Sequence, residues 1–219
     1  MRVVASWLLV LLCAACGQGG GASTSSVTTS SRVADPAGID RIRSRLPAAY
    51  EIATLPKPPM PVTFWGFTAG WAPDPVPCGV LVTVAAGVPV RGWSASGPGG
   101  IVYALAAPGA VPSREVIDEC ANWTLGGGRT TASVSVHDGP PVPDATTIAM
   151  TADIATRVEN GTETRSHATT LIAYTDALAI SVTVVTDPGA GGQPQQEQLP
   201  EQMLGAAVRA IRGVDTGSR

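Results

Sequence analysis

The chain has 219 residues with 14 basic and 17 acidic side chains, a formal net charge of −3. With 44% hydrophobic residues, it is long enough to form one domain around a buried core. The acidic balance argues against nucleic acid as a partner, because binding a polyanion requires clustered Lys and Arg side chains that release its counterions.

The first sixteen residues have the pattern of an export signal. Arg2 precedes an apolar run over residues 3–12, and this run ends in Cys13-Ala14-Ala15-Cys16. A charged start, a short apolar segment and small residues before a cleavage site are typical of a signal peptide. The run is shorter than the roughly 20 apolar residues that a membrane-spanning helix requires.

On Ala14, Ala15 and Cys16, this leader resembles the signal sequence of a bacterial lipoprotein. It departs from that pattern at Cys13, where Leu, Val or Ile is usual. The resemblance implies that residues 1–15 are removed and that Cys16 carries the lipid, which anchors the protein to the cell membrane from outside the cytoplasm. Two acyl chains on one residue give stable attachment. Ordinary secretory cleavage after Ala15, which leaves Cys16 as a free thiol, remains an alternative.

Residues 16–34 are expected to form a flexible tether between the membrane and the folded part. Gly, Ser and Thr predominate there, and such a segment buries too little apolar surface to become ordered. Its length predicts a separation of about 20 to 25 Å. Residues 35–213 then form a single domain, and residues 214–219 a disordered tail.

The domain is predicted to begin with a helix that has Asp35 as its N-cap and Pro36 in its first turn. The apolar face of this helix consists of Ile39, Ile42 and Leu46. A short strand is expected at residues 50–55, followed by an irregular segment rich in aromatic residues and prolines.

The middle of the chain is predicted to alternate strands with one short helix. Strands at residues 91–97 and 101–107 are joined by a glycine-containing turn. Ser113 caps the helix, whose apolar face is expected to consist of Val116, Ile117, Cys120 and Trp123. A further strand is expected at residues 130–136, after a run of three glycines.

The clearest pattern lies between residues 146 and 186. Apolar and polar residues alternate there with a period of two, which predicts an antiparallel meander. Asn160-Gly161 predicts a two-residue hairpin turn. This turn would set Met150 opposite Leu171.

A second tight turn at Thr175-Asp176 would set Leu171 opposite Ile180, so one apolar face is expected to run through the whole meander. The last element is predicted to be a helix from Pro200 to Gly213. Its apolar stripe consists of Leu204, Ala207, Val208 and Ile211. Because an amphipathic helix needs a partner, we expect it on the meander, and the fold class is α+β with N- and C-terminal helices packed on an antiparallel sheet.

Cys78 and Cys120 are expected to form a disulfide. Cys13 leaves with the leader and Cys16 carries the lipid, so these two cysteines remain in an oxidising compartment. In the chain-entropy model, closing a loop of about 43 residues stabilises the fold by about 4 kcal/mol.

Signals for catalysis and metal binding are weak in this sequence. The two histidines, His137 and His167, are interpreted as structural, with His167 on the core side of its strand, and neither has a Cys or His at ligand spacing. We therefore expect no metal, no cofactor and no catalytic residues. The run at residues 92–96 approaches a nucleophile elbow but has Ser in place of its second Gly. A serine hydrolase that uses Ser94 or Ser96 remains an alternative.

Three tryptophans are candidates for a ligand groove. Trp65, Trp71 and Trp93 lie near glycines and prolines, where aromatic side chains can line a groove. The alternative is that they cover the second face of the sheet.

The mature chain resembles an uncharacterised family of mycobacterial lipoproteins over about residues 35–213. The resemblance rests on the run at residues 93–100, the Cys78 and Cys120 pair, the turn at residues 159–164 and the segment at residues 186–189. That family is distantly similar to the extracellular sensor domains of mycobacterial receptor kinases and to Mog1/PsbP-like domains. The resemblance implies an antiparallel sheet with packed helices and a cleft, and it supplies no catalytic residue.

Together these observations predict a lipid-anchored protein of the cell envelope whose domain is sensor-like or ligand-binding and does not catalyse a reaction. Its expected partners are the membrane, through the lipid on Cys16, and a small molecule or an envelope protein. Besides the hydrolase, a structural surface protein without a ligand remains an alternative.

Overall fold

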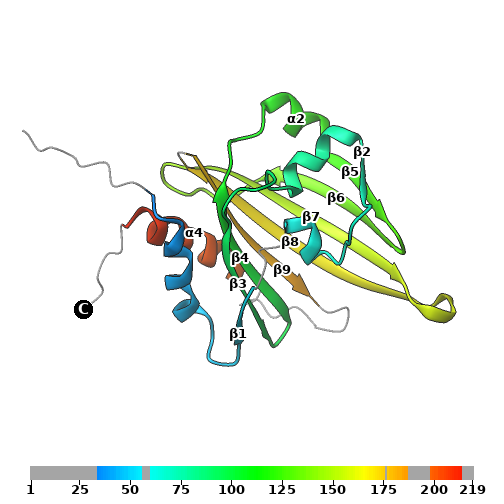
Figure 1. Cartoon of the computed structure of the whole chain (residues 1–219), viewed down its shortest axis with the longest axis horizontal. Helices are drawn as coiled ribbons and strands as arrows, with labels where there is room; N and C mark the ends of the chain where they lie inside the picture. Colours follow the sequence, from blue (N-terminus) through cyan, green and yellow to red (C-terminus); the bar gives the residue numbers. More distant parts are fainter. Residues whose placement is uncertain (1–33, 56–59, 176, 187–197, 214–219) are drawn as a thin grey trace, which may run out of the picture. The chain divides into compact units, whose positions relative to one another are not determined.

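The computed structural model describes residues 34–55, 60–175, 177–186 and 198–213. The predicted leader, Cys16, the tether up to residue 33 and the tail lie outside these residues. The described strands are β1 (Glu51–Thr54), β2 (Ala72–Asp74), β3 (Arg91–Gly97), β4 (Gly100–Pro108), β5 (Asn122–Gly127), β6 (Thr130–Asp138), β7 (Thr146–Arg157), β8 (Glu163–Thr175) and β9 (Leu178–Thr186). They form one antiparallel sheet in the order β1-β3-β4-β9-β8-β7-β6-β5-β2 (Figure 1).

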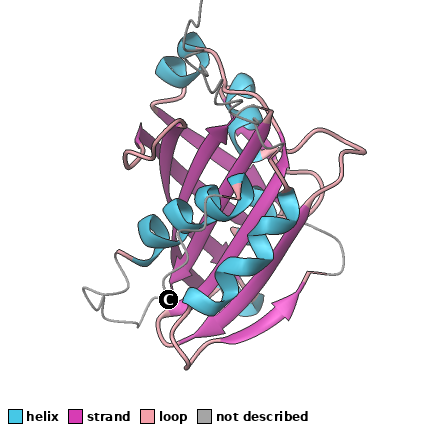
Figure 2. Ribbon diagram, turned by 90° about the vertical axis from the view of Figure 1, so that its left-hand side faces the viewer, coloured by secondary structure: helices cyan, strands magenta, loops and turns pink. Residues whose placement is uncertain are grey.

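Short helical segments surround this sheet. They are η1 (Pro36–Arg45), α1 (Pro61–Phe64), η2 (Val76–Val82), α2 (Arg114–Glu119), η3 (Glu159–Gly161) and α4 (Leu199–Arg212). Helices lie across the strands in Figure 2. Together with the antiparallel sheet they confirm the α+β class. None of the helices in the described ranges combines the length and hydrophobicity needed to cross a membrane.

The first face of the sheet packs against the N- and C-terminal helices, η1 and α4, as predicted. Trp93, Leu171 and Ile180 on the strands share one hydrophobic core with Leu204 and Ile211 of α4. Figure 1 shows η1 and α4 side by side at the same end of the sheet. This core fixes both ends of the described domain to the sheet.

The N-terminal helix begins where the sequence indicates, because the Asp35 side chain accepts a hydrogen bond from the backbone N–H of Ala37. It is a 3₁₀ helix rather than an α-helix. With three residues per turn, Ile39 and Ile42 lie on one face, and both are buried. A Cβ on Gly38 would lie 2.6 Å from the Cα of Ile211, so the glycine permits direct backbone contact between η1 and α4.

The second face of the sheet has its own hydrophobic core. Met150 and Ile172 on the strands pack in one cluster with Trp65, which follows α1, and with Leu81 of η2. The central strands are therefore covered on both sides. The expectation of a single apolar face through the meander is therefore wrong.

The error arises at the β7–β8 hairpin, where the predicted register is wrong by one residue. Met150 pairs with Thr170 instead of Leu171. The connection is a three-residue helical turn, η3, which ends with Gly161 at a φ of +76°, a loop type known for hairpins. Because a shift of one residue reverses the faces, Met150 and Leu171 belong to different cores.

The β8–β9 register differs from the prediction by two residues. Leu171 pairs with Val182 instead of Ile180, and Thr175 pairs with Leu178. Since side chains alternate with a period of two, this even shift leaves Leu171 and Ile180 on the same face. The predicted faces of β8 and β9 relative to each other are therefore confirmed.

Two strands were not expected: β2, which lies in the segment predicted to be irregular, and β5. The helix capped by Ser113 ends at Glu119, and Trp123 lies on β5, which pairs with β6. Trp123 and Leu125 are buried while Thr124 between them is exposed, the period-two pattern of a strand. Trp123 stands three residues after Cys120, which also fits a helix, and this ambiguity explains the error.

Candidate functional site

Two of the three candidate tryptophans lie in the core. Trp93 is 0% exposed and its Nε1–H donates to the carbonyl of Ile39 at 2.8 Å. Trp65 is 2% exposed and donates to the hydroxyl of Thr170 at 3.2 Å. They belong to the first and the second core respectively, and Trp71 is partly buried against the second. The three side chains do not converge on one groove.

The two candidate serines lie on β3, near one edge of the sheet. Ser94 pairs with Ala53 and Tyr103, and Ser96 pairs with Glu51 and Ile101. The strands β4 and β9 separate β3 from β8, which carries His167. No Ser–His pair forms among the described residues.

His167 does not lie on the core side, in contrast to the prediction. The corrected register places it opposite Asp153 instead of Ile154, and its side chain is 45% exposed. Its Nδ1 lies 2.9 Å from a carboxylate oxygen of Asp153. Within the described ranges, no three His, Cys, Asp or Glu side chains gather as a metal ion requires.

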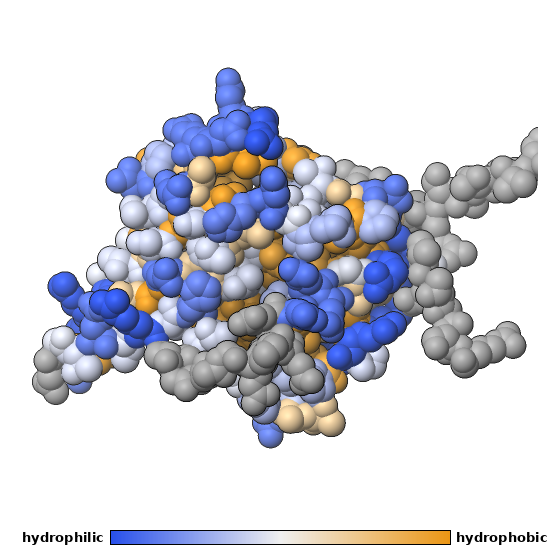
Figure 3. Space-filling model, turned by 180° about the vertical axis from the view of Figure 1, so that it is seen from behind, coloured by the Kyte–Doolittle hydropathy of each residue, from blue (hydrophilic) through white to orange (hydrophobic). Residues whose placement is uncertain are grey.

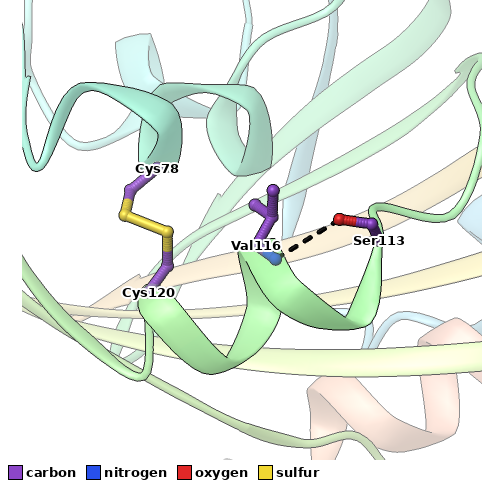
Figure 4. Close-up of a disulfide and its surroundings, with 4 residues drawn as sticks. All are labelled: Cys78, Ser113, Val116 and Cys120. Atoms are coloured by element: carbon purple, nitrogen blue, oxygen red, sulfur yellow. Dashed lines mark hydrogen bonds between the residues drawn. A yellow bond between two sulfur atoms is a disulfide. The ribbon is translucent and has the colours of Figure 1, made fainter.

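The predicted disulfide between Cys78 and Cys120 is present. It joins η2 to the residue that follows α2 (Figure 4). The hydroxyl of Ser113 caps α2 by accepting from the N–H of Val116 at 3.3 Å. The bond therefore closes a loop that contains β3, β4 and the segment that leads into α2.

A pocket of about 440 Å³ lies in the second face, and we call it the central pocket. Its floor is formed by β4, β8 and β9. One wall comes from α1, η2 and the residues after it, and the other from the segment at residues 108–112. The lining residues are Pro61, Val80, Leu81, Thr83, Val84, Ala85, Leu105, Ala107, Pro108, Gly109, Ala110, Val111, Pro112, Ile172, Tyr174, Ala179 and Ser181.

Small side chains leave the space open. Ala107 and Ala179 pair across β4 and β9 on the floor, where most neighbouring positions carry larger residues. A Cβ on Gly109 would lie 2.8 Å from the Cβ of Ala179, so the wall and the floor touch at this glycine. The disulfide holds η2, the opposite wall, within the same covalent loop.

Three hydroxyl groups lie among the apolar residues of the pocket. That of Thr83 donates to the carbonyl of Gly79 at 3.0 Å, and the other two belong to Tyr174 and Ser181. Tyr174 and Ser181 are 8% and 6% exposed. Neither hydroxyl has a hydrogen-bond partner among the described residues, and no charged side chain lines the pocket there. Burial raises the pKa of Tyr174 to about 12, because the phenolate would lose its hydration. The site is thus suited to an uncharged molecule.

The raised pKa of Tyr174 predicts that stability falls as the pH rises from about 10 to about 12. The folded protein holds the neutral phenol over this interval, whereas the unfolded chain releases its proton near pH 10. The stabilisation is complete below pH 10 and decreases by about 1.4 kcal/mol per pH unit above it. Urea titrations of the wild type and Tyr174→Phe at pH 9, 10 and 11 measure this. Equal pH dependence in the two proteins would contradict the prediction.

A second hollow, of about 640 Å³, lies over β5, β6, β7 and β8 and has charged residues in its lining. Its Glu163 and Arg165 pair with each other at 2.9 Å, and Arg165 is 79% exposed. The charged groups of Glu163 and Arg165 are therefore paired with each other and hydrated, and they need no ligand. Seen from behind, the molecule shows hydrophobic residues in gaps between hydrophilic ones (Figure 3), as on an ordinary solvent-facing surface.

Sequence reasoning missed the central pocket. Its lining comes from segments that are far apart in the chain, and pocket formation depends on how they pack. The signals that were present are the small residues Ala107 and Ala179 within otherwise bulky apolar strands and the run Pro108-Gly109 directly after one of them.

Comparison with known proteins identifies a family and a fold. The sequence matches the family described as Domain of unknown function (DUF5642) over residues 35–212. The structure is similar to the X-ray structure of an uncharacterised protein from Mycobacterium smegmatis, the Rv0999 ortholog, with a TM-score of 0.58 and 20% identity over 82% of this chain and 98% of that chain. At this identity the likeness shows a shared fold. None of the curated proteins matches the chain.

Proposed function

The chain belongs to the DUF5642 family, and from this premise we propose that it is a lipid-anchored protein of the cell envelope whose domain binds a small molecule without chemically changing it. The mycobacterial lipoprotein family that its sequence resembles is distantly similar to extracellular sensor domains, and this favours a sensor-like role. The lipoprotein-like leader supports the anchor and the location outside the cytoplasm.

The central pocket is the observation that carries the binding function. Its volume of about 440 Å³ lies within the range of small-molecule sites, roughly 300 to 1,000 Å³. An apolar lining with a few polar groups that fix orientation is also typical of such sites. Here these groups are the hydroxyls of Tyr174 and Ser181, which lack partners among the described residues.

Native mass spectrometry of the protein purified from its own envelope tests this function. We expect a mass that exceeds the lipidated polypeptide by one small molecule and that falls to the polypeptide mass after denaturation. If the native and denatured masses agree, the domain carries no ligand, and a structural surface role replaces the proposal.

The anchor makes a separate prediction. Cys16→Ala should move the protein from the membrane fraction to the soluble extracellular fraction, because the apolar run before Cys16 is too short to span a bilayer. Immunoblots of fractionated cells measure the distribution, with Cys13→Ala as the matched control, which should stay in the membrane fraction. Wild-type protein recovered without lipid in the culture fluid would contradict the anchor.

A further inference from the structure

We infer that the central pocket binds the alkyl or acyl chain of a lipid-like molecule, with one uncharged carbonyl or hydroxyl group of that molecule held by Tyr174 and Ser181. This inference rests on the proposed function, since it names the class of ligand that the same pocket accepts.

The lining excludes a charge inside the pocket. The side chains around the cavity are those of Pro, Val, Leu, Ile, Ala, Thr, Ser and one Tyr, besides a glycine. No Lys, Arg, Asp or Glu lines it among the described residues, and burying a charge without a partner is strongly unfavourable. Tyr174 is the single aromatic side chain in the lining, so a planar ring would find little to stack on. Aliphatic walls favour an aliphatic chain.

The two hydroxyls are placed to hold one polar group. Tyr174 pairs with Ala179 across β8 and β9, and Ser181 is two residues further along β9, on the same face. The two side chains are therefore diagonal neighbours. Neither hydroxyl has a hydrogen-bond partner among the described residues, and both remain accessible from the pocket, so a carbonyl or hydroxyl oxygen bound between them would accept a hydrogen bond from each.

The rim of the pocket is apolar as well. Val80 on the η2 wall is 53% exposed, and Val111 on the opposite wall is 45% exposed. These two exposed valines make the entrance of the cavity apolar on both sides. A chain can thus leave an aqueous or membrane environment and remain in contact with apolar side chains as it enters.

A chain-length series tests the inference. The protein is the chain from Gly17 to Arg219, without its leader and lipidated cysteine, and the readout is displacement of the neutral dye N-phenyl-1-naphthylamine by 1-alkanols from hexanol to dodecanol. We expect affinity to rise about fourfold per methylene, as burial of each group predicts, until the pocket is full. Octanoate should bind at least tenfold more weakly than 1-octanol. Affinity that is independent of length, or equal for octanoate and octanol, would overturn the inference.

Substitutions locate the binding. Ala179→Phe fills the floor and should weaken alkanol binding at least tenfold, whereas Ala53→Phe, on the exposed edge strand β1, should leave it unchanged. Tyr174→Phe keeps the shape of the pocket. It should weaken the binding of 1-octanol about tenfold but the binding of 1-chlorooctane less than twofold. An equal loss for both ligands would refute the hydroxyl contact. If Ala179→Phe fails to fold, the Tyr174→Phe comparison and the length series still decide.

The envelope-purified protein separates failure of the inference from failure of the function. A bound molecule that is charged or wholly polar, together with no saturable alkanol binding, overturns the inference and leaves the binding function standing. No bound molecule and no saturable binding overturn both. Saturable binding that persists in the lipidated protein identifies an external lipid as the source, and binding that is lost there identifies the protein's own anchor; both outcomes support the chain-binding pocket.

Discussion

Trp93→Ala is expected to lower the free energy of unfolding by about 4 kcal/mol. The indole is 0% exposed between η1 and the sheet, and its N–H bonds the carbonyl of Ile39 at 2.8 Å. The substitution leaves a cavity and an unpaired buried carbonyl, and both are destabilising. Urea denaturation followed by circular dichroism measures the change.

Trp71→Ala is the matched control. The Trp71 side chain is only partly buried, so its removal should lower the free energy of unfolding by about 1 kcal/mol or less. Ligand binding by the folded fraction of the Trp93→Ala protein should remain, since Trp93 lies on the face opposite the central pocket. If Trp93→Ala abolished binding and kept wild-type stability, the indole would be a ligand contact and its assignment to the core would be wrong.

The tryptophans show why local sequence context is insufficient to assign a binding role. Glycines and prolines near the tryptophans suggested a groove, although Trp93 lies within the strand predicted at residues 91–97. In the fold, Trp93 lies on the regular strand β3, and Trp65 follows the short helix α1. Burial depends on which element packs on each side chain, and η1, α1 and the sheet come together only through tertiary contacts.

The meander shows which parts of a fold are local. Period-two alternation is a property of each strand alone, and β7, β8 and β9 were predicted from it. The register depends on the turn, and the Asn160-Gly161 pair is compatible with a two-residue or a three-residue loop. The structure has the three-residue loop, with Val158 N–H donating to the carbonyl of Thr162 at 2.8 Å. One residue in a turn thus decided which face Met150 occupies.

The start of the N-terminal helix, the end of the C-terminal helix and the disulfide were predicted correctly because their signals are chemical or local. Asp35 and Gly213 mark helix ends through their own hydrogen bonds and backbone angles. Cys78 and Cys120 are the two cysteines within the described residues, and they pair with each other. The central pocket has no such local signature, because its walls are separated by two strands in the sequence and come together through tertiary packing.

Loss of the Cys78–Cys120 bond is expected to lower the free energy of unfolding by about 4 kcal/mol, since the bond spans 42 residues and its loss increases the entropy of the unfolded chain. The double variant Cys78→Ala/Cys120→Ala should melt roughly 10 °C lower than the wild type. The reduced wild type should match the double variant, and calorimetry of both, in chains that begin at Gly17, measures the effect.

The same bond should also affect the pocket, because it ties the η2 wall to the end of α2. We expect dye binding at a temperature where the double variant is fully folded to weaken, as Val80 and Leu81 lose their fixed position opposite residues 108–112. Ser113→Ala is the control, because it removes the α2 cap, worth about 1 kcal/mol, and keeps the covalent link.

Stability within 1 kcal/mol of the wild type in the double variant would contradict the entropic role of the bond. Unchanged dye binding in a destabilised double variant would show instead that packing on the sheet alone holds η2 in place.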